Sequence, residues 1–414
     1  MENRSAEGSD FIVYVGTRKL VVLKTEPSTK GPRIAGFAGR RNPEGFERGY
    51  VTHLEKAATT IQELIDGLQG GKAEECNAYV VLGNAKLKTF TFSSSHYYGA
   101  GARTITPHEI RSVVSQTRSV ATLPLSESIL QAVPESFLVN DLAGIRDPLG
   151  LEATRLGVTL KIFTMDYQDL KNIANAFESA EVQIKGFFSK HQTLPEAVLT
   201  DREREDGALI VDIADDATHF MLWKENRLVA TRVAGAGSRV LSEQIGAEWG
   251  IDWRDGEKVK EQFGALESKI PFGDELIPLV ERNGKGACSI HRKEFQEKFS
   301  GMARKWLGKT LEDAAAFARD EKVAYPHYVF TGGGTRLEGF YEFVQKNFSC
   351  EGRIAQAKGV EAPTELMADP AHAAELGLCR WLAQHGRSQH RLLAPTGVFQ
   401  KTLASAKDWL SAYF

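Results

Sequence analysis

The chain of 414 residues has few cysteines and no excess of either charge. Its four cysteines form neither a CxxC pair nor a Cys/His cluster at zinc-ligand spacing, which favours free thiols over zinc or disulfides. Lys and Arg total 51 against 54 Asp and Glu, a net charge of −3, so we expect no nucleic-acid partner. No run of ~18 apolar residues and no secretory leader is present, which predicts a cytosolic protein without a membrane span.

Two parts of the chain open with the same pattern of short apolar runs. Residues 11–15 and 20–23 flank a turn at 16–19, which predicts a β-hairpin. Residues 208–213 and 220–223 repeat this spacing in the second half. The recurrence predicts two related α/β lobes with a cleft between them.

A small inserted subdomain is predicted in the segment that runs to about Phe163, because this segment is rich in short strands and turns. Thr106 precedes Pro107 and Glu109, an order typical of a capped helix start. Residues 93–101, SSSHYYGAG, are interpreted as a loop.

A glycine-rich turn, Thr331-Gly332-Gly333-Gly334, lies between a strand predicted over 328–330 and a helix predicted over 337–347. Three glycines let the backbone approach a flat or anionic ligand, and a tight βα turn explains them equally well. The chain has no P-loop and no dinucleotide-binding glycine pattern. Because no Ser/His/Asp arrangement or HExxH motif stands out, we assign no catalytic and no metal-ligating residue.

An acidic turn follows the strand that contains Asp212. Residues 214–218, ADDAT, contain no glycine, and Asp215 and Asp216 would repel a polyphosphate unless a divalent cation intervened. A solvated acidic turn is the favoured interpretation.

The C-terminal residues 398–414 predict an amphipathic helix behind a polar linker at 387–397. A helix docked on its own core is one interpretation, but the linker and the bunched aromatic residues favour an interfacial membrane helix. With few charges, one copy would bind lipid weakly and a polymer of copies more strongly. The predicted membrane-binding residues are Phe399, Leu403, Ala406, Trp409, Leu410, Tyr413 and Phe414.

Together these features resemble the bacterial cell-division family FtsA, within the actin/Hsp70-like superfamily. The resemblance covers nearly the whole chain, and the stretch 144–156 and the tail are its most specific parts. It is carried by residues 49–51, 144–151, 155–156, 256–264, 331–334 and 398–414.

The resemblance implies a two-lobed actin-like (ribonuclease-H-like) α/β ATPase fold with a small inserted subdomain and a C-terminal amphipathic helix. The implied divisions are a first lobe at 10–93 and 166–207, the insertion at 94–165, a second lobe at 208–386 with a small subdomain at 240–320, a linker at 387–397 and a membrane-targeting helix at 398–414. It also implies ATP with Mg in the cleft. The implied nucleotide-binding residues are Gly16, Thr17, Lys19, Asp212, Gly237, Glu257, Lys260, Gly332, Gly333, Gly334 and Arg336.

Both phosphate loops depart from the family pattern. Tyr14 stands where the family has an Asp that helps to hold the metal. In the second loop Asp212 remains, but Ala214, Asp215 and Asp216 replace three glycines and His219 replaces the final Asp. Side chains and negative charge at these places oppose phosphate binding. Whether the chain is an enzyme stays open, and we expect a scaffold with weak or lost ATP hydrolysis.

In function, the resemblance implies a protein at the cytoplasmic face of the plasma membrane, at the division site. It would tether FtsZ filaments, polymerise with itself through the insertion, bind anionic lipids and recruit later division proteins. The family usually carries an Arg in the long helix for the acidic FtsZ peptide, and here Arg304 and Lys305 are the candidates near that place. A genuine ATPase of the same fold, and a peptide-binding module like the pilus protein PilM, are the alternatives.

Overall fold

The computed structural model describes residues 10–28, 31–70, 76–99, 101–267, 273, 275–280, 287–324, 326–348 and 350–393. The chain divides into two compact units. Unit 1 takes in residues 1–197, 359–363 and 374–414, and unit 2 takes in 198–358 and 364–373. Each unit is built around a five-stranded sheet of its own.

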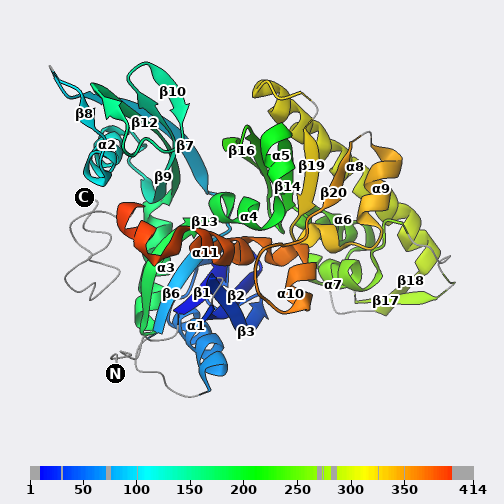
Figure 1. The fold of residues 1–414 in the computed structure, drawn as a ribbon. Coiled ribbons are helices and arrows are strands. Elements are labelled where there is room, and N and C mark those ends of the chain that lie inside the picture. Colours follow the sequence, from blue (N-terminus) through cyan, green and yellow to red (C-terminus); the bar gives the residue numbers. More distant parts are fainter. Residues whose placement is uncertain are drawn as a thin grey trace. The chain divides into compact units, whose positions relative to one another are not determined.

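The sheet of unit 1 has the order β13-β6-β1-β2-β3 (Figure 1). Strand β1 pairs parallel with β6 and antiparallel with β2. The predicted hairpin is therefore present, with Gly16 in its turn. The strands are β1 (Asp10–Val15), β2 (Lys19–Ser28), β3 (Gly31–Arg41), β6 (Cys76–Leu82) and β13 (Val182–Ser189).

Helices cover both faces of this sheet. The apolar stripes of α1 (Leu54–Gln69) and α3 (Tyr167–Ser179) pack against β1 and β6 in one core. On the opposite face Trp381 of α11 (Ala373–Leu393) packs edge-on against Phe188, with ring centroids 5.4 Å apart. Helix α4 (Lys190–Val198) follows β13, and its backbone at Thr193 comes so close to α11 that only glycine fits at Gly377. The small pair β4 (Phe46–Glu47) and β5 (Tyr50–Val51) precedes α1.

The predicted insertion is a four-stranded antiparallel sheet of order β10-β9-β12-β7 with one helix, α2, against it. The helix α2 (Pro107–Val120) begins with the predicted cap, because Thr106 and Glu109 form a capping box. The loop predicted at 93–101 is wrong in its first half, because β7 continues to Tyr97 by pairing with β12. The strands are β7 (Lys88–Tyr97), β9 (Glu127–Val139), β10 (Leu142–Ile145) and β12 (Arg155–Asp166), with β8 (Arg103–Thr104) pairing β11 (Glu152–Ala153).

The sheet of unit 2 repeats the topology of the first. Its order is β16-β15-β14-β19-β20, with β14 parallel to β19 and antiparallel to β15. Strand β14 is thus the counterpart of β1, and β19 of β6. The strands are β14 (Ala208–Ile213), β15 (Thr218–Lys224), β16 (Arg227–Ala234), β19 (His327–Thr331) and β20 (Gly352–Ile354).

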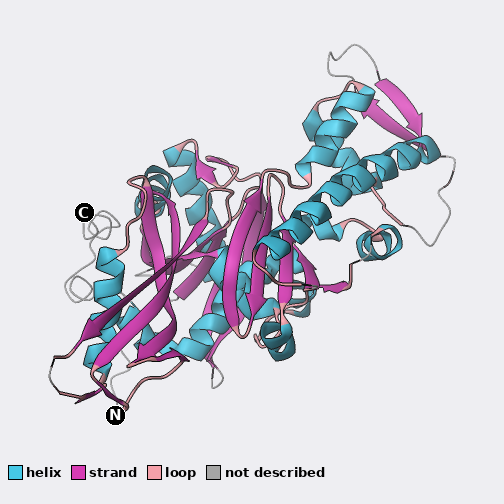
Figure 2. Ribbon diagram, turned by 90° about the horizontal axis from the view of Figure 1, so that it is seen from above, coloured by secondary structure: helices cyan, strands magenta, loops and turns pink. Residues whose placement is uncertain are grey.

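The core of unit 2 lies between its sheet and the long helix α8, which is conspicuous in Figure 2. The predicted helix at 337–347 begins later, at Phe340, because a 3₁₀ turn occupies Gly333–Arg336. The elements are α5 (Asp201–Asp206), α6 (Arg239–Trp249), α7 (Trp253–Phe263), β17 (Leu276–Val280), β18 (Ala287–His291), α8 (Arg292–Asp320), η1 (Gly333–Arg336), α9 (Phe340–Asn347), α10 (Thr364–Ala368) and η2 (Pro370–His372).

Among the described residues, no helix has the length and apolar character that a bilayer crossing requires. Helix α11 continues to Leu393, so the first part of the linker predicted at 387–397 is helical instead. The predicted amphipathic helix at 398–414 lies outside the described residues.

Candidate functional site

The carboxyl ends of the parallel strands β1 and β6 are where an α/β sheet of this kind binds its ligand. In unit 1 the ring of Tyr14 occupies this place. A Cβ added at Gly16 would lie 2.4 Å from Tyr14 Cε1, and one added at Gly83 would lie 2.3 Å from the Tyr14 hydroxyl oxygen. Both glycines are therefore explained by the ring that packs on them. Tyr14 itself is only 7% exposed.

Lys19 belongs to the same corner of unit 1. Its Nζ lies 5.1 Å from the centre of the Tyr14 ring and 3.1 Å from Oε1 of Glu375 on α11. The Glu375 side chain is completely buried, so its charge depends on partners inside the protein. The structure thus brings Lys19 and Gly16 together with Tyr14 of the same loop. It adds Glu375, which the sequence did not place at this site.

In unit 2 the predicted residues Asp212, Gly332 and Gly334 meet at the ends of β14 and β19. A Cβ at Gly332 would lie 2.4 Å from Oδ1 of Asp212, and one at Gly334 would lie 2.3 Å from Cγ2 of Ile213. Gly332 also has φ +88°, which favours glycine. Gly333 differs, because its Cβ position is open and the residue is exposed. A tight turn therefore accounts for two of the three glycines.

The acidic turn at 214–217 is fixed by the start of α6. The Ser238 and Arg239 amides donate to the carbonyls of Ala214 and Asp215 at 2.9 and 2.8 Å. The Arg239 guanidinium donates to Oδ2 of Asp215 from two nitrogens, Nε at 2.7 Å and Nη2. Asp215 is buried, so the solvated turn expected from the sequence is wrong at this residue. Gly237 fits because any side chain would strike the Asp215 carbonyl.

Glu257 and Lys260 on α7, which the resemblance assigns to the adenosine side, are buried and bound to each other. Lys260 Nζ lies 2.7 Å from Oε2 of Glu257 and donates to the Ser238 carbonyl at 3.1 Å. Ser242 on α6 donates to the same Glu257 oxygen. The pair therefore ties α7 to α6.

Arg336, the last predicted nucleotide-binding residue, forms a two-point ion pair with Asp369, with Nε at 2.9 Å from Oδ1. Burial alone would raise the pKa of Asp369, but the hydrogen bond from Arg336 and the Ala371 amide hold that pKa below its usual value. Thr17 lies in the hairpin turn between β1 and β2 and is half-buried.

The partner-binding candidates Arg304 and Lys305 lie exposed on α8. Within the described ranges neither forms a salt bridge with a carboxylate, so both charges face solvent. The membrane-binding candidates from Phe399 to Phe414 lie outside the described residues.

The sequence did not predict the buried polar segment at the start of α4. Lys190 and His191 are at most 1% exposed. Burial, and then the neighbouring Lys190 charge, lower the pKa of His191 to about 3, so the imidazole is neutral at physiological pH. Two polar residues directly after an apolar strand give no sequence signal of burial, because burial is set by tertiary packing, and α11 packs on α4 close to them, at Thr193.

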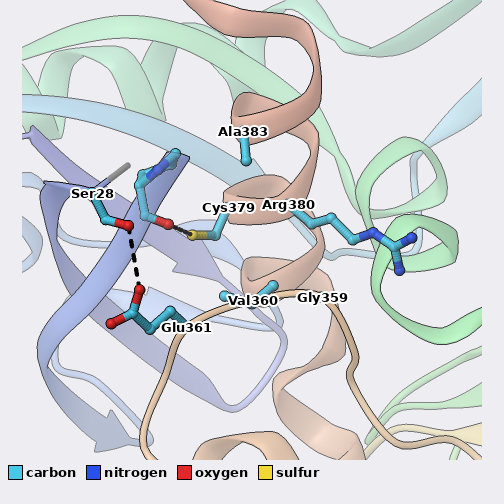
Figure 3. A pocket seen from close by; sticks show the side chains of 8 residues that line it. Ser28, Gly359, Val360, Glu361, Cys379, Arg380 and Ala383 are labelled. Carbon is cyan, nitrogen blue, oxygen red and sulfur yellow. Dashed lines mark hydrogen bonds between the residues drawn. The ribbon is translucent and has the colours of Figure 1, made fainter. Parts of the chain in front are cut away.

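A pocket of about 380 Å³ lies elsewhere in unit 1, between β2, α11 and residues 359–361 (Figure 3). Ser28 donates to Glu361 at its rim, and the Cys379 thiol donates to the Pro32 carbonyl at 3.3 Å. Burial raises the pKa of Cys379 to about 12, which makes the thiol a poor nucleophile at neutral pH. Over the described part of the chain, no group of three or more His, Cys, Asp or Glu residues could hold a metal.

Comparisons with known proteins agree with this architecture. Residues 89–164 match the family model of the SHS2 domain inserted in FtsA. The chain is 22% identical over 408 residues to the cell division protein FtsA of Escherichia coli K12, which covers 96% of this chain and 94% of that protein. FtsA of Pseudomonas aeruginosa is 21% identical over 373 residues, covering 88% and 87%.

Among solved structures, the PilM-PilN type IV pilus biogenesis complex is similar with a TM-score of 0.60 at 15% identity, over 89% of this chain and 97% of that chain. The predicted resemblance to FtsA is confirmed, and the fold is actin-like α/β with an SHS2 insertion.

Proposed function

We propose that this FtsA-like cell division protein is a scaffold that tethers FtsZ filaments to the inner face of the plasma membrane. The observation that carries the proposal is the continuity of its similarity to FtsA, over 96% of the chain and through the inserted SHS2 domain. The domain divisions predicted from the sequence are part of this proposal.

Polymer formation would use the inserted subdomain. Apolar side chains are exposed there, among them Leu125 at 99%, Leu142 at 70% and Val120 at 61%. Exposed apolar residues gathered on one small subdomain favour a protein interface. Self-association would also bring many copies of the tail to the membrane, which multiplies a weak individual affinity.

The FtsZ contact would use α8. Arg304 and Lys305 present two solvent-facing charges to an acidic peptide, which supports this assignment through charge complementarity. The test is a titration of the full chain with the acidic C-terminal FtsZ peptide, followed by fluorescence anisotropy. Replacing both residues by alanine should weaken binding about tenfold if each charge contributes about 0.7 kcal/mol.

Lys309→Ala on the same helix is the matched control, because Lys309 is already paired with Asp313 at 2.7 Å. Unchanged affinity in the Arg304→Ala, Lys305→Ala variant would remove this pair from the proposal.

A second candidate is a peptide-binding module like PilM, favoured by the likeness of fold to the PilM-PilN complex. Such a module is recruited by its partner and needs no anchor of its own. Membrane binding by residues 398–414 in the absence of any partner would therefore separate the two candidates.

A further inference from the structure

We infer that this protein folds and assembles without a bound nucleotide, because its own side chains fill the positions where actin-like proteins are expected to hold ATP phosphates. The absence of a nucleotide requirement for folding rests on the geometry within each unit and holds whether or not the chain tethers FtsZ. Its extension to assembly rests on the proposed polymer. The sequence predicts weak or lost ATP hydrolysis, and the inference goes further, because it holds that the protein needs no bound nucleotide at all.

In unit 1 a phosphate would need free backbone amides at the ends of β1 and β6. The Gly16 amide instead donates to the Lys19 carbonyl at 2.9 Å, and the Gly83 amide donates to the Val15 carbonyl at 3.0 Å. The Tyr14 ring covers both glycines. A carboxylate or a water-bound metal cannot occupy the space that this buried ring takes.

The lysine of the first loop, Lys19, is also bound to other side chains of the protein. Lys19 bonds to the buried carboxylate of Glu375 and lies over the Tyr14 ring. Moving Lys19 to a phosphate would withdraw one partner from a charge that has no access to water, which is costly. Tyr14, Lys19 and Glu375 therefore form a closed internal arrangement.

In unit 2 the second loop is closed in a comparable way. The Ala214 amide donates to the Ala217 carbonyl at 3.0 Å, so it is not free for a phosphate. Asp215 binds Arg239, which holds the side chain of Asp215 in the loop. The loop offers carboxylates where a phosphate needs amides.

The residues that the resemblance assigns to adenosine binding in unit 2 are also bound to groups within the protein. Glu257 and Lys260 are both buried, and they satisfy each other and the backbone of Ser238. No step of the proposed function therefore requires ATP.

The test uses the full chain, titrated with MgATP and MgADP by isothermal calorimetry and followed by the melting temperature Tm in millimolar nucleotide. The expected result is no saturable heat and no change in Tm, because a ligand raises Tm only by binding the folded state. Saturable binding with a micromolar Kd, or a rise in Tm of several degrees, would overturn the inference.

Two variants test the role assigned to Tyr14. Tyr14→Phe keeps the ring and should retain the wild-type Tm, whereas Tyr14→Ala opens a cavity between Gly16 and Gly83 and should lower Tm by several degrees. Equal Tm values for Tyr14→Ala and the wild type would show that the ring does not fill this space, and would overturn the assignment.

Assembly gives an independent readout. Filaments formed on lipid monolayers should be the same in number and length with MgATP, with MgADP and without nucleotide. Assembly that requires ATP would overturn the inference but leave the tether proposal intact, because liposome binding of the chain is measured separately and without nucleotide.

Discussion

The ion pair between Lys19 and Glu375 offers a direct way to distinguish an internal role for Lys19 from a phosphate-binding role. The two residues lie 356 positions apart in the chain and join the start of β2 to α11. The Glu375 side chain is completely buried and that of Lys19 is 21% exposed, so water screens the pair little. The perturbation is Lys19→Met, which keeps the length of the side chain and removes its charge.

Removing one partner of a buried ion pair costs about 3–5 kcal/mol, because the other charge remains buried without it. We expect about 3 kcal/mol for Lys19→Met, since the lysine retains some contact with solvent. The double variant Lys19→Met, Glu375→Gln should be less destabilised than the sum of the two single variants, by about 1–3 kcal/mol.

The assay is calorimetric unfolding of the full chain without nucleotide. Lys56→Met is the control, because Lys56 forms an exposed pair with Glu44 at 3.3 Å and such pairs contribute at most about 1 kcal/mol. A phosphate-binding lysine would behave differently, since its loss would leave the ligand-free protein unchanged. If Lys19→Met unfolds at the same temperature as Lys56→Met, the reasoning about this site is refuted.

Two further predictions concern acid stability. Burial alone would raise the pKa of Glu203, but hydrogen bonds from Arg353 and the Thr200 cap lower it to about 2. The Glu203 carboxylate should contribute on the order of 2 kcal/mol to the free energy of unfolding above pH 4.5, and this contribution should be lost as the pH falls toward 2. The variant Glu203→Gln should lose this pH dependence. If the free energy of unfolding of Glu203→Gln follows pH as that of the wild type does, the prediction is wrong. Burial lowers the pKa of His191 from 6.5 to about 3. Between pH 6.5 and pH 3 the imidazole is therefore protonated in the unfolded chain and neutral in the folded protein. Stability should therefore decrease on acidification by up to about 1.4 kcal/mol per pH unit, and His191→Gln should flatten the slope of unfolding free energy against pH.

Local features of the sequence predicted local structure well. The strand-turn-strand openings at residues 11–23 and 208–223 are present because their apolar runs are buried in two sheets of the same topology. The capping box at Thr106 and Glu109 lies within one turn of helix, so its residues alone specify it. The polar stretch 93–97 gave no strand signal, because β7 is an edge strand whose side chains need not be apolar.

The candidate site was predictable only in part. The substitutions at Tyr14 and at 214–216 are visible in the sequence, and they predict altered phosphate loops. What the sequence could not provide was the partner of each group, because Glu375 reaches Lys19 only through the packing of α11 on the sheet. Similarly, the sequence predicts a solvated Asp215, because the contact with Arg239 forms only when the start of α6 packs against the loop.

Sedimentation of FtsZ polymers with anionic liposomes is the decisive experiment for the proposed tether. It compares the full chain with a chain ending at Leu393, which keeps α11 whole, and with the full-length variant Trp409→Glu. We expect the full chain to pellet with liposomes and to carry FtsZ with it, and both altered proteins to stay in solution. If the chain ending at Leu393 pellets as well as the full chain, residues 398–414 are not the anchor and the proposed tether is contradicted.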